Sequence, residues 1–244
     1  MSNDDAQNVS ITDDPIYYIT AGFFALLTTV LPASLGQPRF LPILQTATLF
    51  IFVAVALHHR NVRGALKVMA IWLPIQFIVM VVMTRFFSMQ LEAAIANGFE
   101  ERAAITVWFF AGAPHPTALT TAPGAYITSL LVTLLGSLIT AGISGIWSTV
   151  RLLNLAGYHT GILLTLVTNP TVGLLTIPYW TLLRAAAYGG LVILCAQPLL
   201  TYNWSPGYYW RNQKQLIVGS LALLGAAIIL ELILPGVFAQ SPVN

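Results

Sequence analysis

Charge is the scarcest property of this sequence. Only 7% of its 244 residues are Asp, Glu, Lys or Arg, against about 25% in a typical soluble domain. A chain so poor in charge cannot cover a surface that faces water, so lipid must be its main solvent. Hydrophobic residues make up 57% of the sequence, and the mean hydropathy is +0.79. The composition therefore predicts an integral membrane protein whose main partner is the bilayer.

Several classes of function are disfavoured by what is missing. The net charge is only +2, and no basic run could follow a phosphate backbone, so we expect no nucleic-acid partner. The single cysteine, Cys195, can form neither an internal disulfide nor a thiolate metal cluster. No nucleophile elbow, phosphate-binding glycine loop or HExxH helix occurs. We therefore expect no enzymatic activity, no metal and no cofactor.

Long apolar segments divide the chain. A helix needs about 20 mostly apolar residues to cross a hydrocarbon core of about 30 Å. A single transmembrane domain is predicted over residues 17–235, between a polar acidic tail (1–16) and a short C-terminal tail (236–244). The fold class is therefore an all-α polytopic bundle of about seven spans. The predicted spans are Tyr17–Leu35, Phe40–Leu57, Ala65–Phe87, Gly124–Trp147, Leu153–Ile177, Tyr179–Leu200 and Leu216–Leu234.

The fifth predicted span leaves an alternative open, because Asn169 and Pro170 could instead cap a re-entrant half-helix. Short cytoplasmic loops carry an excess of Lys and Arg, and seven spans give such an excess on the N-terminal side. A dipping segment over 153–178 would remove it. With seven spans, the inner set is Arg60, Arg63, Lys67, Arg151, Arg211 and Lys214, and the outer set is Arg39, Arg85, Arg102 and Arg184.

This charge bias predicts a cytoplasmic N-terminus and a C-terminus outside. The first 15 residues contain no Lys or Arg, unlike the positive start of a signal peptide, so we expect the tail to remain attached. The expected location is a bacterial plasma membrane.

Residues 88–123 form the longest predicted segment outside the membrane. Their first half has the composition of an amphipathic helix that lies along the outer interface. The aromatic run Trp108, Phe109 and Phe110 is typical of an anchor at the headgroup level. A proline-stiffened loop follows it.

Small residues recur every four positions in the predicted fourth span. Side chains of this size allow helix backbones to approach closely in lipid, where little hydrophobic drive exists between helices. We interpret the stripe as a packing surface of a central helix, although its hydroxyls could instead line a polar path. The stripe consists of Ala125, Ser129, Thr133, Ser137, Ala141, Gly145 and Thr149.

Ionisable residues inside predicted spans are candidates for function, because lipid cannot solvate them. Arg184 lies about one turn into the sixth span, and Glu231 lies about one turn from the end of the seventh. Both fall toward the predicted outer face, so we expect an ion pair. The alternative is a site for an anionic headgroup or solute, with Arg184 as the anchor.

The histidines are weak candidates for haem ligands. His58 and His59 end the second predicted span, and His159 begins the fifth, so their imidazoles could lie at a similar depth. No fixed spacing supports haem binding, and polar boundary residues are the simpler interpretation. His115 stands between two prolines and has no partner in the sequence.

Two functions of different classes fit these observations. The favoured one is a non-catalytic structural or accessory subunit of a membrane complex, with protein partners in the membrane. The other is a small-solute permease, suggested by prolines that interrupt spans, such as Pro74, Pro170 and Pro198. A haem- or pigment-binding protein is a weaker third possibility. A polar cavity near the middle of the bilayer would favour the permease, whereas a dry centre would count against it.

Overall fold

The computed structural model describes residues 11–239, and all regular secondary structure in that range is helical. Most of the predicted acidic tail, and residues 240–244 of the C-terminal tail, lie outside the described residues. Five segments, rather than seven, are long and apolar enough to cross a membrane. These segments are α1 (Pro15–Ser34), α2 (Phe40–His58), α3 (Val62–Phe86), α9 with α10 (Pro170–Leu174 and Tyr179–Thr201) and α12 (Lys214–Ala239).

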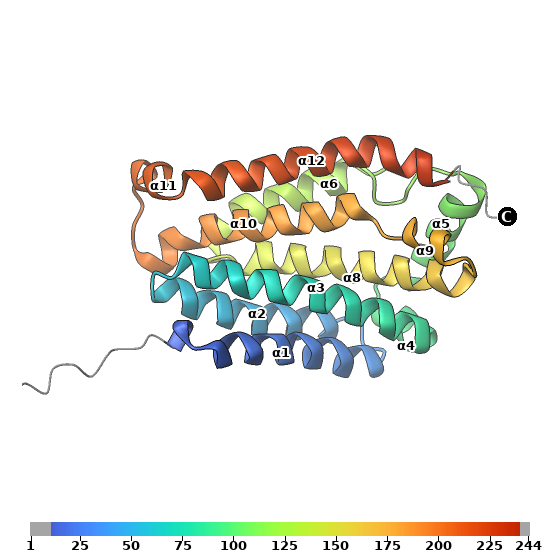
Figure 1. The fold of residues 1–244 in the computed structure, drawn as a ribbon, viewed down its shortest axis with the longest axis horizontal. Helices are drawn as coiled ribbons and strands as arrows, with labels where there is room; N and C mark the ends of the chain where they lie inside the picture. Colours follow the sequence, from blue (N-terminus) through green and yellow to red (C-terminus); the bar gives the residue numbers. More distant parts are fainter. Residues whose placement is uncertain (1–10, 240–244) are drawn as a thin grey trace, which may run out of the picture.

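The long helices run roughly parallel along the molecule (Figure 1). α1, α2 and α3 pack together on one side, and α12 packs on α10 at the opposite edge. Between them lies α8 (Ile143–Leu166), which contacts α2, α3 and α10. The N-terminal end of α1 and the short helix α11 (Pro206–Asn212) lie at one end of the bundle, and the C-terminal end of α12 lies at the other.

The predicted fourth span is wrong, because the chain reverses inside it. Helix α6 (Pro123–Leu131) continues through a π-helical stretch, η2 (Val132–Gly136), into α7 (Ser137–Ile139). At the turn, Gly142 takes a φ of 98°, which an L-residue with a side chain rarely adopts. Helix α8 then runs back from Ile143. Apolar content alone cannot reveal this turn, because the residues around it are small or apolar.

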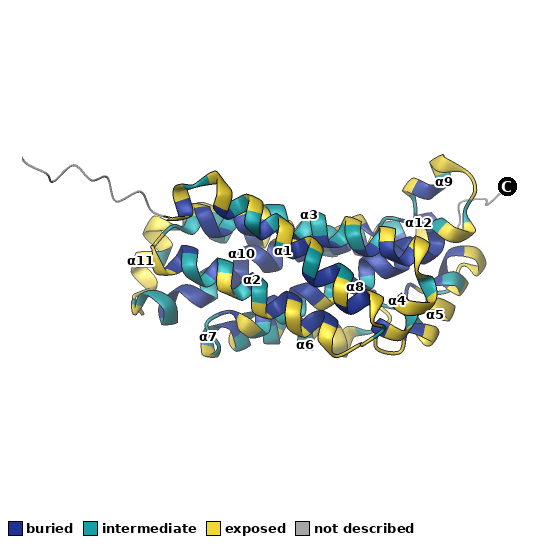
Figure 2. Ribbon diagram, turned by 90° about the horizontal axis from the view of Figure 1, so that it is seen from below, coloured by how far each residue is buried: buried dark blue, intermediate teal, exposed yellow. Residues whose placement is uncertain are grey.

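The predicted fifth span is wrong for the same reason. We call residues 123–166 the hairpin, since α6, η2 and α7 form one arm and α8 forms the other. Helix α8 begins ten residues before the predicted start at Leu153 and ends at Leu166. The segment around Pro170 is not re-entrant: α9 projects from one end of the molecule as a short helix (Figure 2).

The turn of the hairpin lies inside the bundle. A Cβ placed on Gly142 would come within 3.0 Å of Cβ of Ala196 and 3.3 Å of Cγ1 of Val192. Ala196 precedes the end of α10 at Thr201 by five residues, or about 8 Å. The arm Pro123–Ile139 has 17 residues, which span only about 25 Å. The hairpin therefore enters and leaves at the same end of the bundle.

The backbone groups at this turn are satisfied locally, as the absence of water in the hydrocarbon core requires. The Gly142 amide donates to the Ser137 carbonyl (2.9 Å). The Ser144 amide donates to Thr140 Oγ1 (3.1 Å), and Ser144 Oγ donates to the Val132 carbonyl (3.3 Å). The small polar residues of the turn thus replace water.

The small-residue stripe is divided between the two arms rather than following one helix. Thr133 and Ser137 lie on the first arm, and Gly145 and Thr149 lie on α8, and all four are buried. A Cβ on Gly145 would lie 2.1 Å from Ser137 Oγ and 2.5 Å from Cγ2 of Val192. The small residues therefore form the seam that lets the arms approach each other and α10.

Residues 88–111 cover the end of the bundle as two helices instead of the one predicted. α4 (Ser88–Ala94) and α5 (Gly98–Ala111) are separated at Asn97, whose φ is 58°. The predicted aromatic anchor is wrong for Trp108, which is only 2% exposed and donates from Nε1 to the Pro235 carbonyl (3.1 Å). Its neighbour Phe109 is buried as well. These rings close the end of the bundle.

Candidate functional site

A hydrogen-bonded chain of buried amide side chains fills the middle of the bundle. Gln45 donates from Nε2 to Thr29 Oγ1 (2.8 Å) and accepts from Asn154 Nδ2 (2.7 Å). Asn154 Oδ1 accepts from Gln76 Nε2 (2.8 Å), and Gln76 Oε1 accepts from Trp72 Nε1 (2.9 Å). All five side chains are buried. Because such bonds hold helices together in lipid, they fix α1, α2, α3 and α8 at one level.

Sequence reasoning did not single out this amide chain. Its members are isolated uncharged residues within apolar helices, and no spacing marks them as a group. Only the packing of four helices brings them together.

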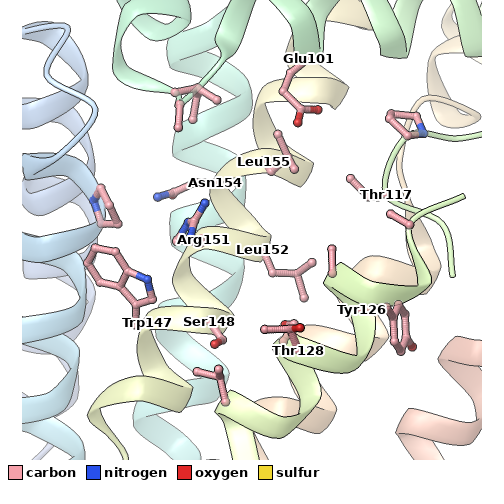
Figure 3. Close-up of a pocket in the computed structure, with 18 of the residues that line it drawn as sticks. Glu101, Thr117, Tyr126, Thr128, Trp147, Ser148, Arg151, Leu152, Asn154 and Leu155 are labelled. Atoms are coloured by element: carbon pink, nitrogen blue, oxygen red, sulfur yellow. The ribbon is translucent and has the colours of Figure 1, made fainter. Parts of the chain in front are cut away.

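Beside this chain lies a groove of about 680 Å³ between α2, α6 and α8. Its floor is α8, which contributes Trp147, Ser148, Arg151 and Leu155. Figure 3 shows these residues opposite Thr128 of α6. The groove exists because only the far half of the first arm packs closely on α8, where the small-residue seam lies.

Arg151 is the unusual residue of the groove. It is exposed and forms neither an ion pair nor a hydrogen bond with any residue between 11 and 239. The preceding residue, Val150, accepts at its carbonyl from Gln76 Nε2 (3.1 Å), and Gln76 lies near the middle of α3. Arg151 is therefore about half-way along the bundle, and its predicted place in an inner loop is wrong.

The free-energy cost of a charge half-way along an apolar bundle is large enough that the position of Arg151 needs an explanation. A charged side chain at the centre of a membrane helix costs about 3 kcal/mol or more. The sequence signal for Arg151 was present, since it is a lone arginine between two apolar stretches. It was missed because the turn at Gly142 was not recognised, which displaced α8 relative to the membrane.

Arg184 and Glu231 lie where the sequence predicts an ion pair. Arg184 Nη1 is 3.3 Å from Glu231 Oε1, and each residue is only 4% exposed. The guanidinium also lies 4.4 Å from the centre of the Tyr126 ring, a cation–π contact. The pair joins α10 to α12, and Arg184 reaches the wall of the groove with its charge already balanced.

A histidine cluster lies at the end of the groove beneath α5. His159 Nε2 is 3.0 Å from Glu101 Oε2, and Glu101 lines the groove. The His115 ring, only 3% exposed, lies 6.2 Å from the His159 ring and 4.6 Å from the Trp108 ring. Burial, together with the charges of His159 and Arg184, lowers the pKa of His115 to about 3.

The predicted common depth of the haem-ligand candidates is wrong. His58 and His59 are exposed at the far end of α2. Gln45, which binds Asn154 of α8, precedes His58 by 13 residues, or about 20 Å along α2. His159 lies beyond Asn154 in the opposite direction. Because the turn at Gly142 starts α8 ten residues earlier than predicted, His159 lies near the other end of the bundle from His58 and His59.

Comparison of the chain with protein-family models, with curated proteins and with solved structures finds no significant match in any of the three. Function is therefore argued from the geometry of the groove and from the membrane character of the helices.

Proposed function

We propose that this protein is a permease for an anionic amphiphile, which binds in the groove between α2, α6 and α8. The observation that carries this proposal is the guanidinium of Arg151, which lies about half-way along the bundle and has no partner among the residues that the structure describes. A carboxylate or phosphate in the groove would supply the missing counter-charge. Guanidinium groups bind such anions by paired, charge-assisted hydrogen bonds.

The rest of the groove supports a ligand with an apolar part. Leu41 and Pro42 of α2 and Val132 of the first arm form its walls, and Leu152 and Leu155 form part of its floor. These residues lie within helices at membrane depth. Hydroxyl groups of Thr128, Ser129 and Ser148 line the groove around Arg151. An ionic headgroup near Arg151 with a hydrocarbon tail along the walls matches this division.

Transport, rather than storage, is suggested by the hairpin. Broken helices with non-helical backbone at membrane depth are typical of substrate sites in transporters. The first arm contains a π-helical stretch, Val132–Gly136, and such stretches occur often at functional sites. We infer that movement of α6 relative to α8 changes which side of the groove is open.

The orientation inferred from the sequence is kept in this proposal. Five basic residues lie at the bundle end that holds the N-terminus of α1, and three lie at the other end. An excess of Lys and Arg marks the cytoplasmic side, so the N-terminal end faces the cytoplasm and α5 faces outside. The two sets are Arg60, Arg63, Lys67, Arg211 and Lys214, and Arg39, Arg85 and Arg102.

Quenching of tryptophan fluorescence tests the binding step. The probe is a long-chain carboxylate brominated on its tail, added to the protein in lipid nanodiscs. We expect saturable quenching of Trp147, absent in Trp147→Phe and weakened at least tenfold in Arg151→Gln. Arg151→Lys keeps the charge and should retain most of the affinity. Equal quenching curves for the wild type and Arg151→Gln would contradict the proposal.

Uptake of the labelled carboxylate into proteoliposomes then tests transport. We expect uptake by the wild type above that of protein-free vesicles and loss of this uptake in Arg151→Gln. Saturable binding without uptake would make the protein a receptor for the amphiphile instead of a permease.

A further inference from the structure

A second groove, of about 670 Å³, lies between α3 and α12. Its floor is α10, which contacts both of these helices and contributes Ala186 and Gly190. A Cβ on Gly190 would lie 2.1 Å from Ser220 Oγ of α12, and a Cβ on Gly189 would lie 3.7 Å from Cδ1 of Leu73 on α3. The small residues of α10 therefore bring both walls close to the floor, while the space above the floor stays open.

The two ends of this second groove differ in polarity. At the end that holds α11, charged and amide side chains from three helices line it. Further along, the walls are apolar: Leu66, Met69 and Leu73 follow one another on α3, and Leu216 and Leu223 lie on α12. The groove is therefore amphiphilic along its length. Its polar end is lined by Arg63, Tyr208, Asn212, Gln213 and Gln215.

The length of the second groove matches one leaflet of a bilayer. Arg63 and Leu73 are ten residues apart on α3, which corresponds to about 15 Å, half of a hydrocarbon core of about 30 Å. Helix α11, beside the polar end, has no buried residue and carries Tyr208 and Trp210. Because such rings favour the headgroup level, the polar end lies at that level and the apolar walls lie deeper.

The polar end of the second groove carries positive charge without a counter-charge. Arg63 is exposed, its side chain makes no ion pair or hydrogen bond with residues 11–239, and none of the lining residues is acidic. A small pocket of about 110 Å³ shares Val62, Tyr208 and Gln213 with the groove and adds Arg60. The Arg60 side chain likewise has no partner among the described residues. Guanidinium groups bind phosphate by paired, charge-assisted hydrogen bonds.

We propose that the second groove binds one anionic phospholipid, with its phosphate near Arg63 and Arg60 and an acyl chain along the walls of α3 and α12. A phospholipid, rather than soluble phosphate, fits because the basic end continues into an apolar groove one leaflet long. Basic pockets between helices on the cytoplasmic side are typical sites for anionic headgroups, and the orientation proposed above places Arg63 on that side. The inference does not rest on transport through the first groove.

Native mass spectrometry of the full chain in mild detergent tests the site. The background is Arg151→Gln, so that the first groove does not bind the anionic lipid. The probes are phosphatidylglycerol and zwitterionic phosphatidylcholine with the same dioleoyl chains. We expect one phosphatidylglycerol per chain, bound at least about fivefold more tightly than phosphatidylcholine, which is the contribution of one basic residue near an anionic membrane surface. Arg63→Gln, added to the background, should remove this preference.

Lys67→Gln is the matched control for charge. Lys67 is exposed about one turn after Arg63 on α3, but its Nζ lies 5.4 Å from the centre of the Tyr18 ring of α1, and it does not line the groove. Affinity for phosphatidylglycerol should stay within about twofold of the background, since salt screens exposed charges beyond about 8 Å. An equal loss in Lys67→Gln and Arg63→Gln would overturn the proposal, because general attraction to this end would explain both.

Gly219→Leu tests the acyl-chain part of the site. Gly219 lines the groove, and a Cβ there has no neighbour within 4 Å, so the variant should fold while its side chain fills the groove. We expect weaker binding of phosphatidylglycerol although the charge is unchanged. Gly225→Leu is the matched control, because its Cβ is equally unhindered on the same helix and it does not line the groove.

Three results would overturn the lipid site: equal affinity of the background for both lipids, unchanged binding in Arg63→Gln, or unchanged binding in Gly219→Leu. An adduct that persists in Arg151→Gln and is lost in Arg63→Gln belongs to the second groove. The outcome is therefore independent of whether the first groove transports an amphiphile.

Discussion

At the scale of single residues, two arginines of the helical bundle have opposite surroundings. Arg184 is buried against the Glu231 carboxylate and the Tyr126 ring, whereas Arg151 faces an open groove without a counter-charge from any residue between 11 and 239. The first arrangement satisfies a charge that lipid cannot solvate, and it clamps two helices. In the second arrangement, the Arg151 guanidinium keeps a charge that an anionic ligand can neutralise.

Removal of Glu231 should therefore be costly. In Glu231→Gln the Arg184 guanidinium stays buried without its partner, and loss of one member of a buried pair typically costs about 3–5 kcal/mol. We expect a correspondingly lower free energy of unfolding in denaturant titrations in mild detergent. The double variant with Arg184→Gln should recover part of the loss, since no unpaired charge remains. Unchanged stability of Glu231→Gln would contradict the clamp.

Acid should destabilise the fold through His115. Its pKa falls from 6.5 to about 3 on burial, so the unfolded chain binds a proton that the folded chain excludes between these values. Stability from this group is therefore complete above about pH 6.5 and is lost as the pH falls toward 3. The full loss is on the order of 5 kcal/mol.

The variant His115→Leu isolates this contribution, because it removes the titrating ring and keeps an apolar side chain beside Trp108. Thermal unfolding of both proteins between pH 7 and 4 should show a steeper loss of stability in the wild type. Parallel pH profiles would contradict a buried neutral His115.

At the scale of elements, the hairpin determines the architecture. Two arms of small residues can meet only because a glycine with positive φ and the hydroxyls of Thr140 and Ser144 satisfy a turn inside the bundle. This turn places Arg151 at the floor of the groove instead of in a loop. It also leaves α6 on the other side of the groove from α8.

Gly145→Leu tests the seam of the hairpin. Added atoms would collide with Ser137 and Val192, because even a Cβ lies within 2.5 Å of both side chains. We expect loss of about 3 kcal/mol or more, seen as poor expression or an aggregated profile in size-exclusion chromatography. Gly124→Leu is the matched control, since a Cβ there has no neighbour within 4 Å. Normal behaviour of Gly145→Leu would refute the close contact.

Cysteine labelling tests whether the hairpin is re-entrant. In a Cys195→Ala background, Ala141→Cys should react with a membrane-impermeant maleimide from neither side, because the turn lies beside Val192 and Ala196. Thr168→Cys, which is exposed beyond α8, should be labelled from the side that α5 faces. Rapid labelling of Ala141→Cys from the N-terminal side would instead show a full span.

At the scale of the whole molecule, the apolar helices pack around α8, and the first arm of the hairpin lies at the edge of the bundle beside the groove (Figure 2). The groove is the feature that leads us to propose a permease rather than an accessory subunit. A centre filled throughout by apolar side chains would have favoured a packing role. A groove of about 680 Å³ beside the chain of buried amide side chains favours ligand binding instead.

Purification in mild detergent, followed by native mass spectrometry, separates these two functions. We expect a particle that contains this chain with a bound anionic amphiphile, and loss of that mass in Arg151→Gln. A stoichiometric partner protein that is lost in the same variant would show that an acidic group of a partner occupies the groove. The accessory-subunit interpretation would then replace the permease.

The membrane character, the helical class and five of the spans follow from the sequence alone, because burial in lipid requires long apolar segments whatever their packing. Arg184 and Glu231 were also visible, since charges inside apolar segments stand out. Three other features could not be predicted from the sequence: the turn at Gly142, the amide chain around Asn154 and the partners of His115. Each of these depends on which helix lies beside which, and small or uncharged side chains carry no one-dimensional signal of their neighbours. The tertiary structure alone therefore places Arg151 about half-way along the bundle, which is the observation on which the proposed function rests.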